Sequence, residues 1–321
     1  MNYPSPLLID PKFGVLSMIT CFRMTRAAAA RVLFVALILV VSHNTPAKTP
    51  RAKHQAKSKT SVGHRSEKKL LTNILKDQRA IWTAPFHLHE TDAKWLAPLG
   101  LSTLALMATD RHTSAELVEH GDNLRRLRVS GDISRIGSLY ATGGAVAALY
   151  LTGRATHNDR LRETGLLGAE ALIDSELVVH ALKAASQRQR IPVDNSSGEF
   201  FDGGSSFPSG HAINAWSLAT IVAQEYGRHR PLVQVGAYGL ATAVSISRYT
   251  GRKHFLSDVL VGSALGYGIG RYVYHQRHDV ALDAENEQQN NARVRSKLFP
   301  RIVPLYSPRA HAYGGMLAWN F

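Results

Sequence analysis

A succession of apolar runs with helical spacing constrains the fold of this chain more than any other feature of its sequence. From Leu70 onward these runs are rich in Ala and Gly, and clusters of Gly, Pro, Asn or Asp separate them. Few stretches alternate with period two, so the pattern predicts an all-α multi-helix bundle with closely packed helices. The runs are LLTNILKDQRAIW, WLAPLGLSTLALMATD, IGSLYATGGAVAALYLTG, TGLLGAEALIDSELVVHALKAA, HAINAWSLATIVAQEY, LVQVGAYGLATAVSIS and SDVLVGSALGYGIGRYVYH.

The same small residues are common in membrane helices, so composition alone leaves two interpretations open. Most of the runs also hold a polar group, and the mean hydropathy of the chain is -0.13. These two observations favour a soluble or surface-bound bundle over a protein with six membrane spans.

A targeting signal is predicted before the helical region. Arg26 and Arg31 precede the apolar run VLFVALILVV, and the small residue Ala47 follows at a distance that suits cleavage. The run is too short to span a bilayer, which needs about 20 residues. We therefore expect a signal peptide over residues 1–47, with Met24 as an alternative start, and export to the periplasm or cell envelope. An uncleaved N-terminal anchor is the alternative.

The positive charge of the chain is concentrated after this signal. The whole chain has 38 Lys and Arg against 24 Asp and Glu, and eight of the basic residues but a single Glu lie within residues 48–69. Such a segment cannot bury a core, so it is predicted to be a disordered basic linker. A merely solvated linker is the simplest interpretation, and contact with an anionic membrane surface or envelope polymer is the alternative. The segment holds no aromatic residue, so nucleic acid is not expected as a partner. The only cysteine, Cys21, lies in the signal, which leaves the mature chain without disulfides.

The remaining boundaries follow from polarity. We expect the helical domain to occupy residues 70–278 and a polar linker with a C-terminal tail to occupy residues 279–321. The tail, IVPLYSPRAHAYGGMLAWNF, contains two prolines and several aromatic residues, which favours an extended conformation.

The stretch SSFPSGHAINAW predicts an anion site at the start of a helix. The first N–H groups of a helix have no partner within it, and the helix dipole is positive at that end. Gly210 would let a ligand approach the backbone closely, and His211 would stand beside a bound oxyanion with a proton to give. A surface turn in which a histidine caps the helix is the simpler alternative.

Two further clusters supply the groups that phosphate chemistry needs. In SRYTGRKHFLSD, His254 and Asp258 are four residues apart, so on a helix the carboxylate can hold one ring nitrogen and leave the other free to attack. The other cluster, KAASQRQR, begins with Lys183 and ends with Arg190. Together with Arg248 of the first cluster, these residues give three cations that can neutralise a phosphoryl group in its transition state. Scattered surface ion pairs would explain any one cluster, but the three together favour a single site.

In this order, K-x6-R, then PSGH, then SR-x5-H-x3-D, the motifs resemble those of the type 2 phosphatidic acid phosphatase superfamily. That superfamily includes bacterial acid phosphatases, lipid phosphate phosphatases and vanadium haloperoxidases. The resemblance implies an all-α bundle that hydrolyses phosphate esters without a metal or other cofactor. It implies that His254 is the nucleophile that forms a phosphohistidine, Asp258 its orienting carboxylate and His211 the general acid. The implied phosphate-binding residues are Lys183, Arg190, Arg248, Ser209 and Gly210, the last two also through their backbone amides.

One residue departs from the family pattern. Pro usually follows the second basic residue of the first motif, but here Ile191 stands between Arg190 and Pro192. The guanidinium of Arg190 is still expected to reach the phosphate, and Arg188 is a candidate substitute.

Three functions remain open on these motifs. The first is a phosphatase that acts on phosphomonoesters, either phosphorylated small molecules or lipid phosphates. The second is a vanadate-dependent haloperoxidase, because vanadate resembles the phosphorane in the same cradle. The third is an exported envelope-binding protein without catalysis.

Overall fold

The computed structural model of the protein describes residues 69–87, 89–119, 124–191, 198–228, 230–279, 301–307 and 312–318. The predicted signal peptide and nearly all of the predicted basic linker lie outside these residues. Most of the predicted polar linker, residues 280–300, lies outside them as well.

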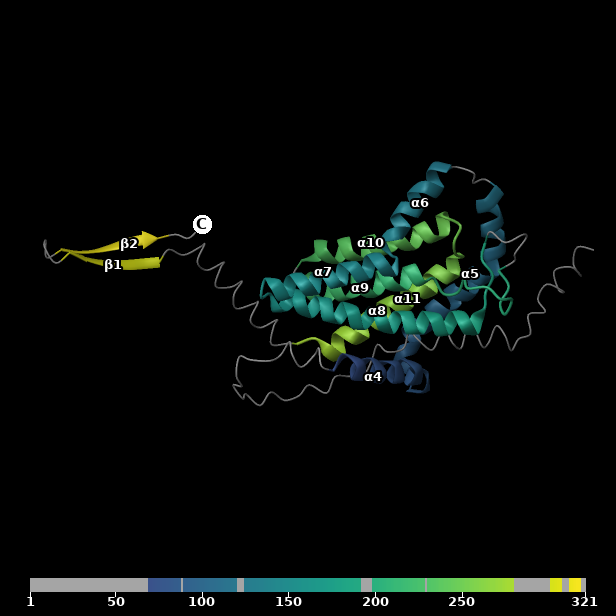
Figure 1. Cartoon of the computed structure of the whole chain (residues 1–321), viewed down its shortest axis with the longest axis horizontal. Coiled ribbons are helices and arrows are strands. Elements are labelled where there is room, and N and C mark those ends of the chain that lie inside the picture. Colours follow the sequence, from purple (N-terminus) through teal and green to yellow (C-terminus); the bar gives the residue numbers. More distant parts are fainter. Residues whose placement is uncertain are drawn as a thin grey trace, which may run out of the picture.

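Helices account for most of the described chain (Figure 1), which confirms the predicted all-α bundle. Each of the seven apolar runs lies within a helix or overlaps most of one. Two short 3-10 helices, Ala84–His87 and Glu90–Asp92, connect the first two α-helices. The α-helices are α4 (Leu70–Thr83), α5 (Ala93–Glu119), α6 (Leu124–Ile136), α7 (Leu139–Ala155), α8 (Asp159–Ser186), α9 (Gly210–Gly227), α10 (Pro231–Thr250) and α11 (Leu256–Arg277).

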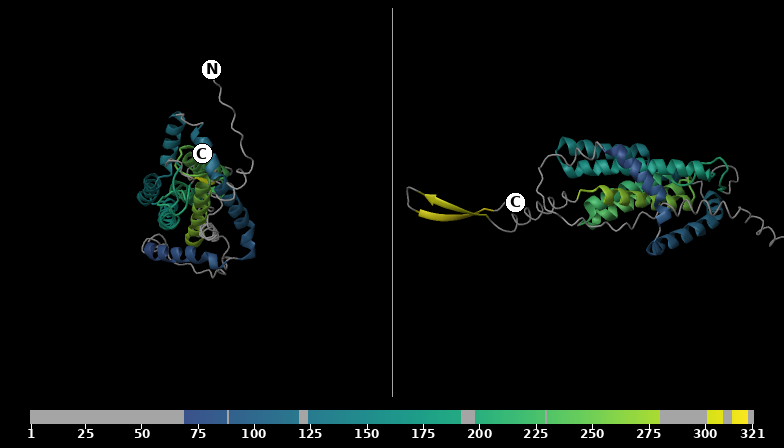
Figure 2. Two further views of the ribbon diagram at one scale, coloured as in Figure 1. Left: turned by 90° about the vertical axis from the view of Figure 1, so that its right-hand side faces the viewer. Right: turned by 90° about the horizontal axis from the view of Figure 1, so that it is seen from below.

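The three helices α8, α9 and α11 form the centre of the bundle. Helix α7 packs along α8, α10 packs along α9, and α4 crosses the bundle on one side (Figure 2). The buried apolar core lies mainly between α8, α9 and α11, with Leu167, Val178 and Leu182 from α8 and Ile213 and Ile221 from α9. Among the described helices, none combines the length and apolarity needed to cross a membrane.

Glycines at every fourth position of α11 allow it to lie directly on the backbone of α9. A Cβ at Gly262 would lie 2.7 Å from the carbonyl oxygen of Ser209, and one at Gly266 would lie 2.3 Å from that of Ile213. Gly270 repeats this contact one turn further along. No side chain can fit at such distances, so these positions bring the starts of α9 and α11 together.

The C-terminal tail contains two strands, as its extended pattern predicted. Strands β1 (Arg301–Ser307) and β2 (Ala312–Ala318) pair antiparallel, with Arg301 opposite Ala318 and Ser307 opposite Ala312. They form a two-stranded hairpin beyond the helical domain in the sequence.

Candidate active site

The predicted site residues meet at one end of the bundle, where α8 and α10 end and α9 and α11 begin. Lys183 lies near the end of α8 and Arg248 near the end of α10. His211 lies in the first turn of α9, and Asp258 lies in the first turn of α11. The glycine contacts between α9 and α11 hold these two helix starts side by side.

The loop before α9 is held tightly against the end of α8. The amide of Phe201 donates a hydrogen bond to the Ser186 carbonyl at 2.8 Å, and the amide of Ser206 donates one to the Arg188 carbonyl at 2.8 Å. Gly204 passes so close to the same backbone that a Cβ there would lie 2.1 Å from the Arg188 carbonyl oxygen. These hydrogen bonds fix the loop that carries Ser205 and Ser206, which contact the predicted site residues.

His254 is buried, and a main-chain carbonyl defines the state of its ring. Its Nδ1 atom lies 2.8 Å from the Ser206 carbonyl oxygen and 3.6 Å from Oδ2 of Asp258. A carbonyl can only accept a hydrogen bond, so Nδ1 carries the proton and Nε2 keeps its lone pair in the neutral ring. The sequence predicts Asp258 as the partner that selects this tautomer, but the nearer acceptor is the Ser206 carbonyl.

Asp258 is fully buried, and stronger donors than His254 occupy both of its oxygens. Oδ1 accepts a hydrogen bond from Arg188 at 2.6 Å, while Oδ2 accepts one from the Ser206 hydroxyl at 2.5 Å and one from the Phe255 amide at 3.0 Å. Burial alone would raise the pKa of this carboxyl. The Arg188 charge and the hydrogen bonds outweigh that effect and lower the pKa of Asp258 to about 2.

Burial and the surrounding cations favour the neutral form of both histidines. Burial lowers the pKa of His211 to about 4, and the charges of Arg248 and Lys183 contribute to this shift. Burial also lowers the pKa of His254 to about 4, although the neighbouring Asp258 opposes the change. Before an anion binds, burial and the charges of the protein therefore leave both imidazoles neutral at neutral pH.

The three predicted clamp cations lie close enough to perturb one another. Lys183 donates to the Ser205 carbonyl at 3.0 Å, and Arg190 donates to the Ser205 hydroxyl at 3.2 Å, while Arg248 donates to the Ser134 hydroxyl. Burial and the charge of Arg190 lower the pKa of Lys183, and the same two causes lower that of Arg248 to about 10. Three like charges in a partly buried space suit an oxyanion.

The inserted Ile191 does not turn the clamp arginine away. Ile191 is itself buried, while Arg190 contacts the same serine as Lys183. Pro192 lies outside the described residues.

The start of α9 is only partly arranged as predicted. Ser209 is buried, and its hydroxyl has no hydrogen-bond partner among the described residues and does not cap the helix, which suits contact with a ligand. Its amide, however, donates to the Asp258 carbonyl at 3.1 Å, so the predicted use of that amide for phosphate was wrong. A Cβ at Gly210 would meet only Val179, at 3.8 Å, which leaves room beside its backbone.

Arg188 is not the substitute clamp residue that the sequence suggested. It is 2% exposed, and its guanidinium already binds Asp258, Ser257 and Asp110. Ser206 and Asp110 also belong to the site, although no motif in the sequence points to them. Ser206 contacts His254 through its backbone carbonyl, and Asp110 contacts Arg188 across 78 residues of sequence. The sequence carries no pattern for either contact.

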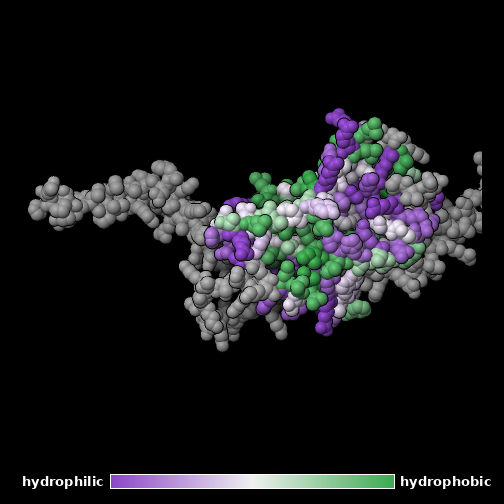
Figure 3. Space-filling view, viewed as in Figure 1, coloured by the Kyte–Doolittle hydropathy of each residue, from purple (hydrophilic) through white to green (hydrophobic). Residues whose placement is uncertain are grey.

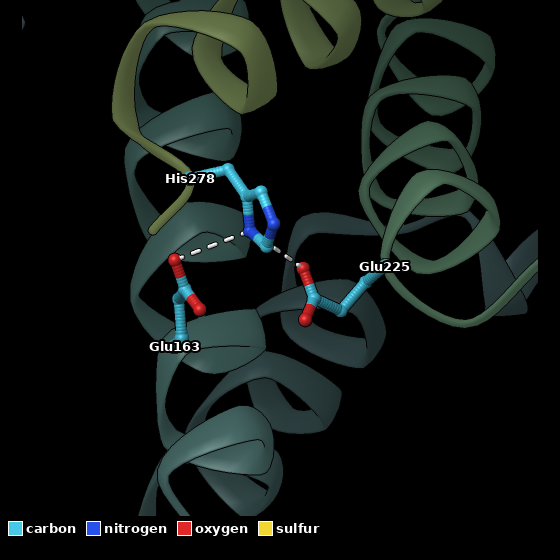
Figure 4. Close-up of side chains that lie close together, drawn as sticks. All are labelled: Glu163, Glu225 and His278. Atoms are coloured by element: carbon cyan, nitrogen blue, oxygen red, sulfur yellow. Dashed lines mark ion pairs between the residues drawn. The ribbon is translucent and has the colours of Figure 1, made fainter. Parts of the chain in front are cut away.

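Among the described residues, one group of side chains has the spacing of a metal site, at the other end of the bundle. Glu163, Glu225 and His278 face one another there (Figure 4), with Nδ1 of His278 at 3.3 Å from Glu163 and 3.2 Å from Glu225. Although burial opposes it, the hydrogen bonds and charges of the two carboxylates raise the pKa of His278 to about 10. Arg160 also pairs with Glu225 at 3.1 Å. Two cations thus balance two carboxylates, and we assign the group to structural ion pairing.

The fold and the site define a class of protein: an all-α bundle with a buried histidine and a cluster of cations at one end. Residues 164–281 match the family model of the PAP2 superfamily, which confirms the resemblance seen in the motifs.

Two individual proteins are similar to parts of the chain. The lipid A 1-phosphatase of Porphyromonas gingivalis is 41% identical over 69 residues, which are 22% of this chain and 16% of that protein. The match therefore spans only a small part of that relative. The crystal structure of the first transmembrane PAP2 type phosphatidylglycerolphosphate phosphatase from Bacillus subtilis matches with a TM-score of 0.45 and 24% identity. That match covers 57% of this chain and 96% of the other.

Proposed function

We propose that the protein is a phosphatase that hydrolyses lipid phosphates through a phosphohistidine intermediate, without a metal. The observation that carries this proposal is the hydrogen bond from Nδ1 of His254 to the Ser206 carbonyl. It leaves Nε2 as the basic nitrogen of a buried ring that lies near the cations Lys183 and Arg248 and near a second histidine, His211. An uncharged nucleophile with adjacent cations suits attack on a phosphate dianion.

The proposed reaction has two steps. Nε2 of His254 attacks phosphorus and the bond from phosphorus to the leaving oxygen breaks, while His211 donates a proton to that oxygen. Water then attacks the phosphohistidine, His211 takes a proton from the water, and the nitrogen–phosphorus bond breaks to release inorganic phosphate. Lys183, Arg190 and Arg248 bind the phosphoryl oxygens throughout, assisted by the hydroxyl of Ser209 and the backbone at Gly210.

The surface next to the site supports a lipid as the carrier of the phosphate. Residues 139–153 of α7 and residues 231–247 of α10 contain no Asp, Glu, Lys, Arg or His, yet both helices are largely exposed. Gly137, just before α7, lies beside the backbone of His211, and Arg248 lies in the last turn of α10, so both apolar surfaces start near the site. The exposed large apolar side chains of these helices are Leu139, Tyr140, Leu151, Leu232, Val235, Leu240 and Ile246.

Apolar side chains gather over the middle of the bundle, with hydrophilic residues toward its two ends (Figure 3). Such a band suits acyl chains, whose phosphate would then lie at the polar end that holds the site. The similarity to a protein named lipid A 1-phosphatase is a second, independent support for a lipid phosphate.

A turnover screen tests the proposal. The purified protein should release phosphate from phosphatidic acid in mixed micelles faster than from glycerol phosphate, which has the same phosphoester but no acyl chains. His254→Ala should abolish release from both, and a chelator should leave the rate unchanged, while vanadate should inhibit. Rescue by a divalent metal after chelation, or oxidation of bromide when vanadate and peroxide are supplied, would contradict the proposal.

We also propose that the protein acts outside the cytoplasm, because of the apolar run that ends before Ala47. These residues lie outside the described part of the chain. Mass spectrometry of the protein from an exporting host should find an N-terminus near Lys48, and an intact N-terminus in the cytosol would contradict export.

A further inference from the structure

Arg188 is the most extensively bonded side chain near the site. Its Nη1 atom donates to Asp258 and to the Ser257 hydroxyl, both at 2.6 Å, and its Nη2 atom donates to Asp110 at 2.8 Å. Its Nε atom donates to the Gly198 carbonyl at 3.1 Å. All three nitrogens of the guanidinium are therefore engaged with the protein, so the group is fixed and is not free to bind phosphate.

Two aromatic rings hold the faces of the same guanidinium. Its central carbon lies 4.8 Å from the ring centre of Phe200 and 4.2 Å from that of Phe255. Phe255 follows His254 directly and is the N-cap residue of α11. The stacked ring therefore connects Arg188 with the short segment that carries the proposed nucleophile.

Asp110 anchors this arrangement from α5, a helix that lies outside the segment matched by the family model. It is 1% exposed, and besides Arg188 it accepts hydrogen bonds from the hydroxyl and the amide of Ser257. Asp110 and Asp258 thus share one guanidinium, and Ser257 lies between them. Two buried carboxylates without that cation would be strongly unfavourable.

We propose that Arg188, held in place by Asp110, is a positioning residue for the reaction, because it fixes Asp258 and the His254 segment in their working arrangement. This inference rests on the proposed function. It assigns to α5 a part in the site that the three motifs do not reveal.

The charges around His254 determine the sign of the expected effect. The groups that face it are Asp258 on α11, Lys183 on α8, His211 on α9 and Arg248 on α10, with Arg188 and Asp110 behind Asp258. Loss of the Arg188 charge would raise the pKa of Asp258 and that of His254, because a nearby cation lowers both. Loss of the Asp110 charge would lower the pKa of His254, because a nearby carboxylate is removed.

Two variants with opposite charge changes test the inference. In Arg188→Gln, kcat should fall on the order of 10²-fold while KM changes little, because the clamp cations remain and only the nucleophile loses its orientation. The acid limb of the pH profile should move to higher pH by about one pH unit. In Asp110→Asn, kcat should fall less, and the acid limb should move to lower pH. Arg188→Lys, which keeps the charge but not the planar fork, should restore the pH profile more than kcat.

Arg277→Gln is the matched control. Arg277 is a half-buried arginine that also has two carboxylate partners, Asp77 at 2.5 Å and Glu170 at 2.9 Å, but it lies at the opposite end of α11. Its loss should reduce the thermal midpoint without moving the pH profile. The control should lose activity only in proportion to its folded fraction. If Arg188→Gln and Asp110→Asn do the same, Arg188 has a merely structural role and the inference is wrong.

A titration without turnover separates this inference from the proposed function. The ring of His254 can be followed by NMR with labelled histidine, using Asp110→Asn if Arg188→Gln does not fold. Opposite shifts of the His254 pKa in the two variants, or a downward shift in Asp110→Asn alone, would support the positioning role even if the protein hydrolysed no phosphate. An unchanged His254 pKa in each folded variant would overturn the role even if the wild-type protein were an active phosphatase.

Discussion

Binding of an oxyanion should be coupled to uptake of a proton by His211. Burial and the cations of the site lower the pKa of His211 to about 4, so almost no His211 is protonated at pH 7. A general acid must carry a proton, and a bound dianion supplies the charge that would retain it. A unit charge about 4 Å away contributes about 4 kcal/mol at an effective dielectric constant of about 20. At about 1.4 kcal/mol for each pH unit, this raises the pKa by about three, to about 7.

Isothermal titration calorimetry measures this coupling. Tungstate is a suitable probe because it is already a dianion at neutral pH and need not itself release or take up a proton. Titrations in two buffers with different ionisation enthalpies should give uptake of about half a proton at pH 7 and about one tenth at pH 8. His211→Gln should still bind tungstate but lose this uptake.

His254 is the necessary control for that experiment, since its pKa is also lowered to about 4. His254→Ala should keep most of the proton uptake, because the assigned acid is still present. If wild-type protein takes up no proton on binding tungstate, or if His211→Gln takes up as much as wild type, His211 is not the group that protonates the leaving oxygen.

Three further outcomes follow from the geometry. Gly266→Ala should lower the free energy of unfolding by about 1 to 3 kcal/mol in urea titrations, because the new methyl group would press on the backbone of α9, whereas Gly236→Ala on the open side of α10 should not destabilise. The raised pKa of His278, about 10, predicts that His278→Gln is most destabilising below pH about 6.5, and that thermal melts of the two proteins converge as the pH passes about 10. His211→Ala should slow an alkyl phosphate by about 10² to 10⁴ but an activated aryl phosphate much less, and equal loss on both substrates would contradict its role.

The fold could largely be predicted because its helices are encoded by local periodicity. The seven runs from Leu70 onward correspond, in order, to seven of the eight α-helices in the described part of the chain, and the glycine spacing of α11 agrees with its close contact with α9. Helix α6 was missed because its sequence, LRRLRVSGDISRI, is rich in arginine and shows no continuous apolar run. The tail was expected to be extended, but the pairing of its strands depends on register, which composition does not specify.

The site could be predicted where side chains carry the chemistry and could not where the backbone does. Lys183, His211 and His254 were identified because their types and spacing are characteristic. The acceptor for His254 is a main-chain carbonyl, and every residue offers one, so no letter in the sequence marks it. Arg188 was misassigned for a related reason. From sequence alone, Arg188 is interpreted as another phosphate-binding cation because it lies two residues from Arg190. Its carboxylate partners, Asp110 and Asp258, become known only from the structure.

The distribution of charge explains why these two arginines differ although they are two residues apart. Arg188 lies behind the proposed nucleophile with Asp110 and Asp258, where cations and carboxylates compensate one another. Arg190 lies near Lys183 and Arg248, and its charge contributes to the lowered pKa of each of these two groups. The paired charges around Arg188 hold the proposed nucleophile in place, whereas the excess of cations at Lys183, Arg190 and Arg248 favours an incoming dianion. Together with burial, these cations also favour the neutral form of both imidazoles before an anion binds. One short segment thus supplies both the paired arginine and the clamp arginine. Gln187, in the left-handed conformation, ends α8, and Arg188 and Arg190 follow it directly with different partners.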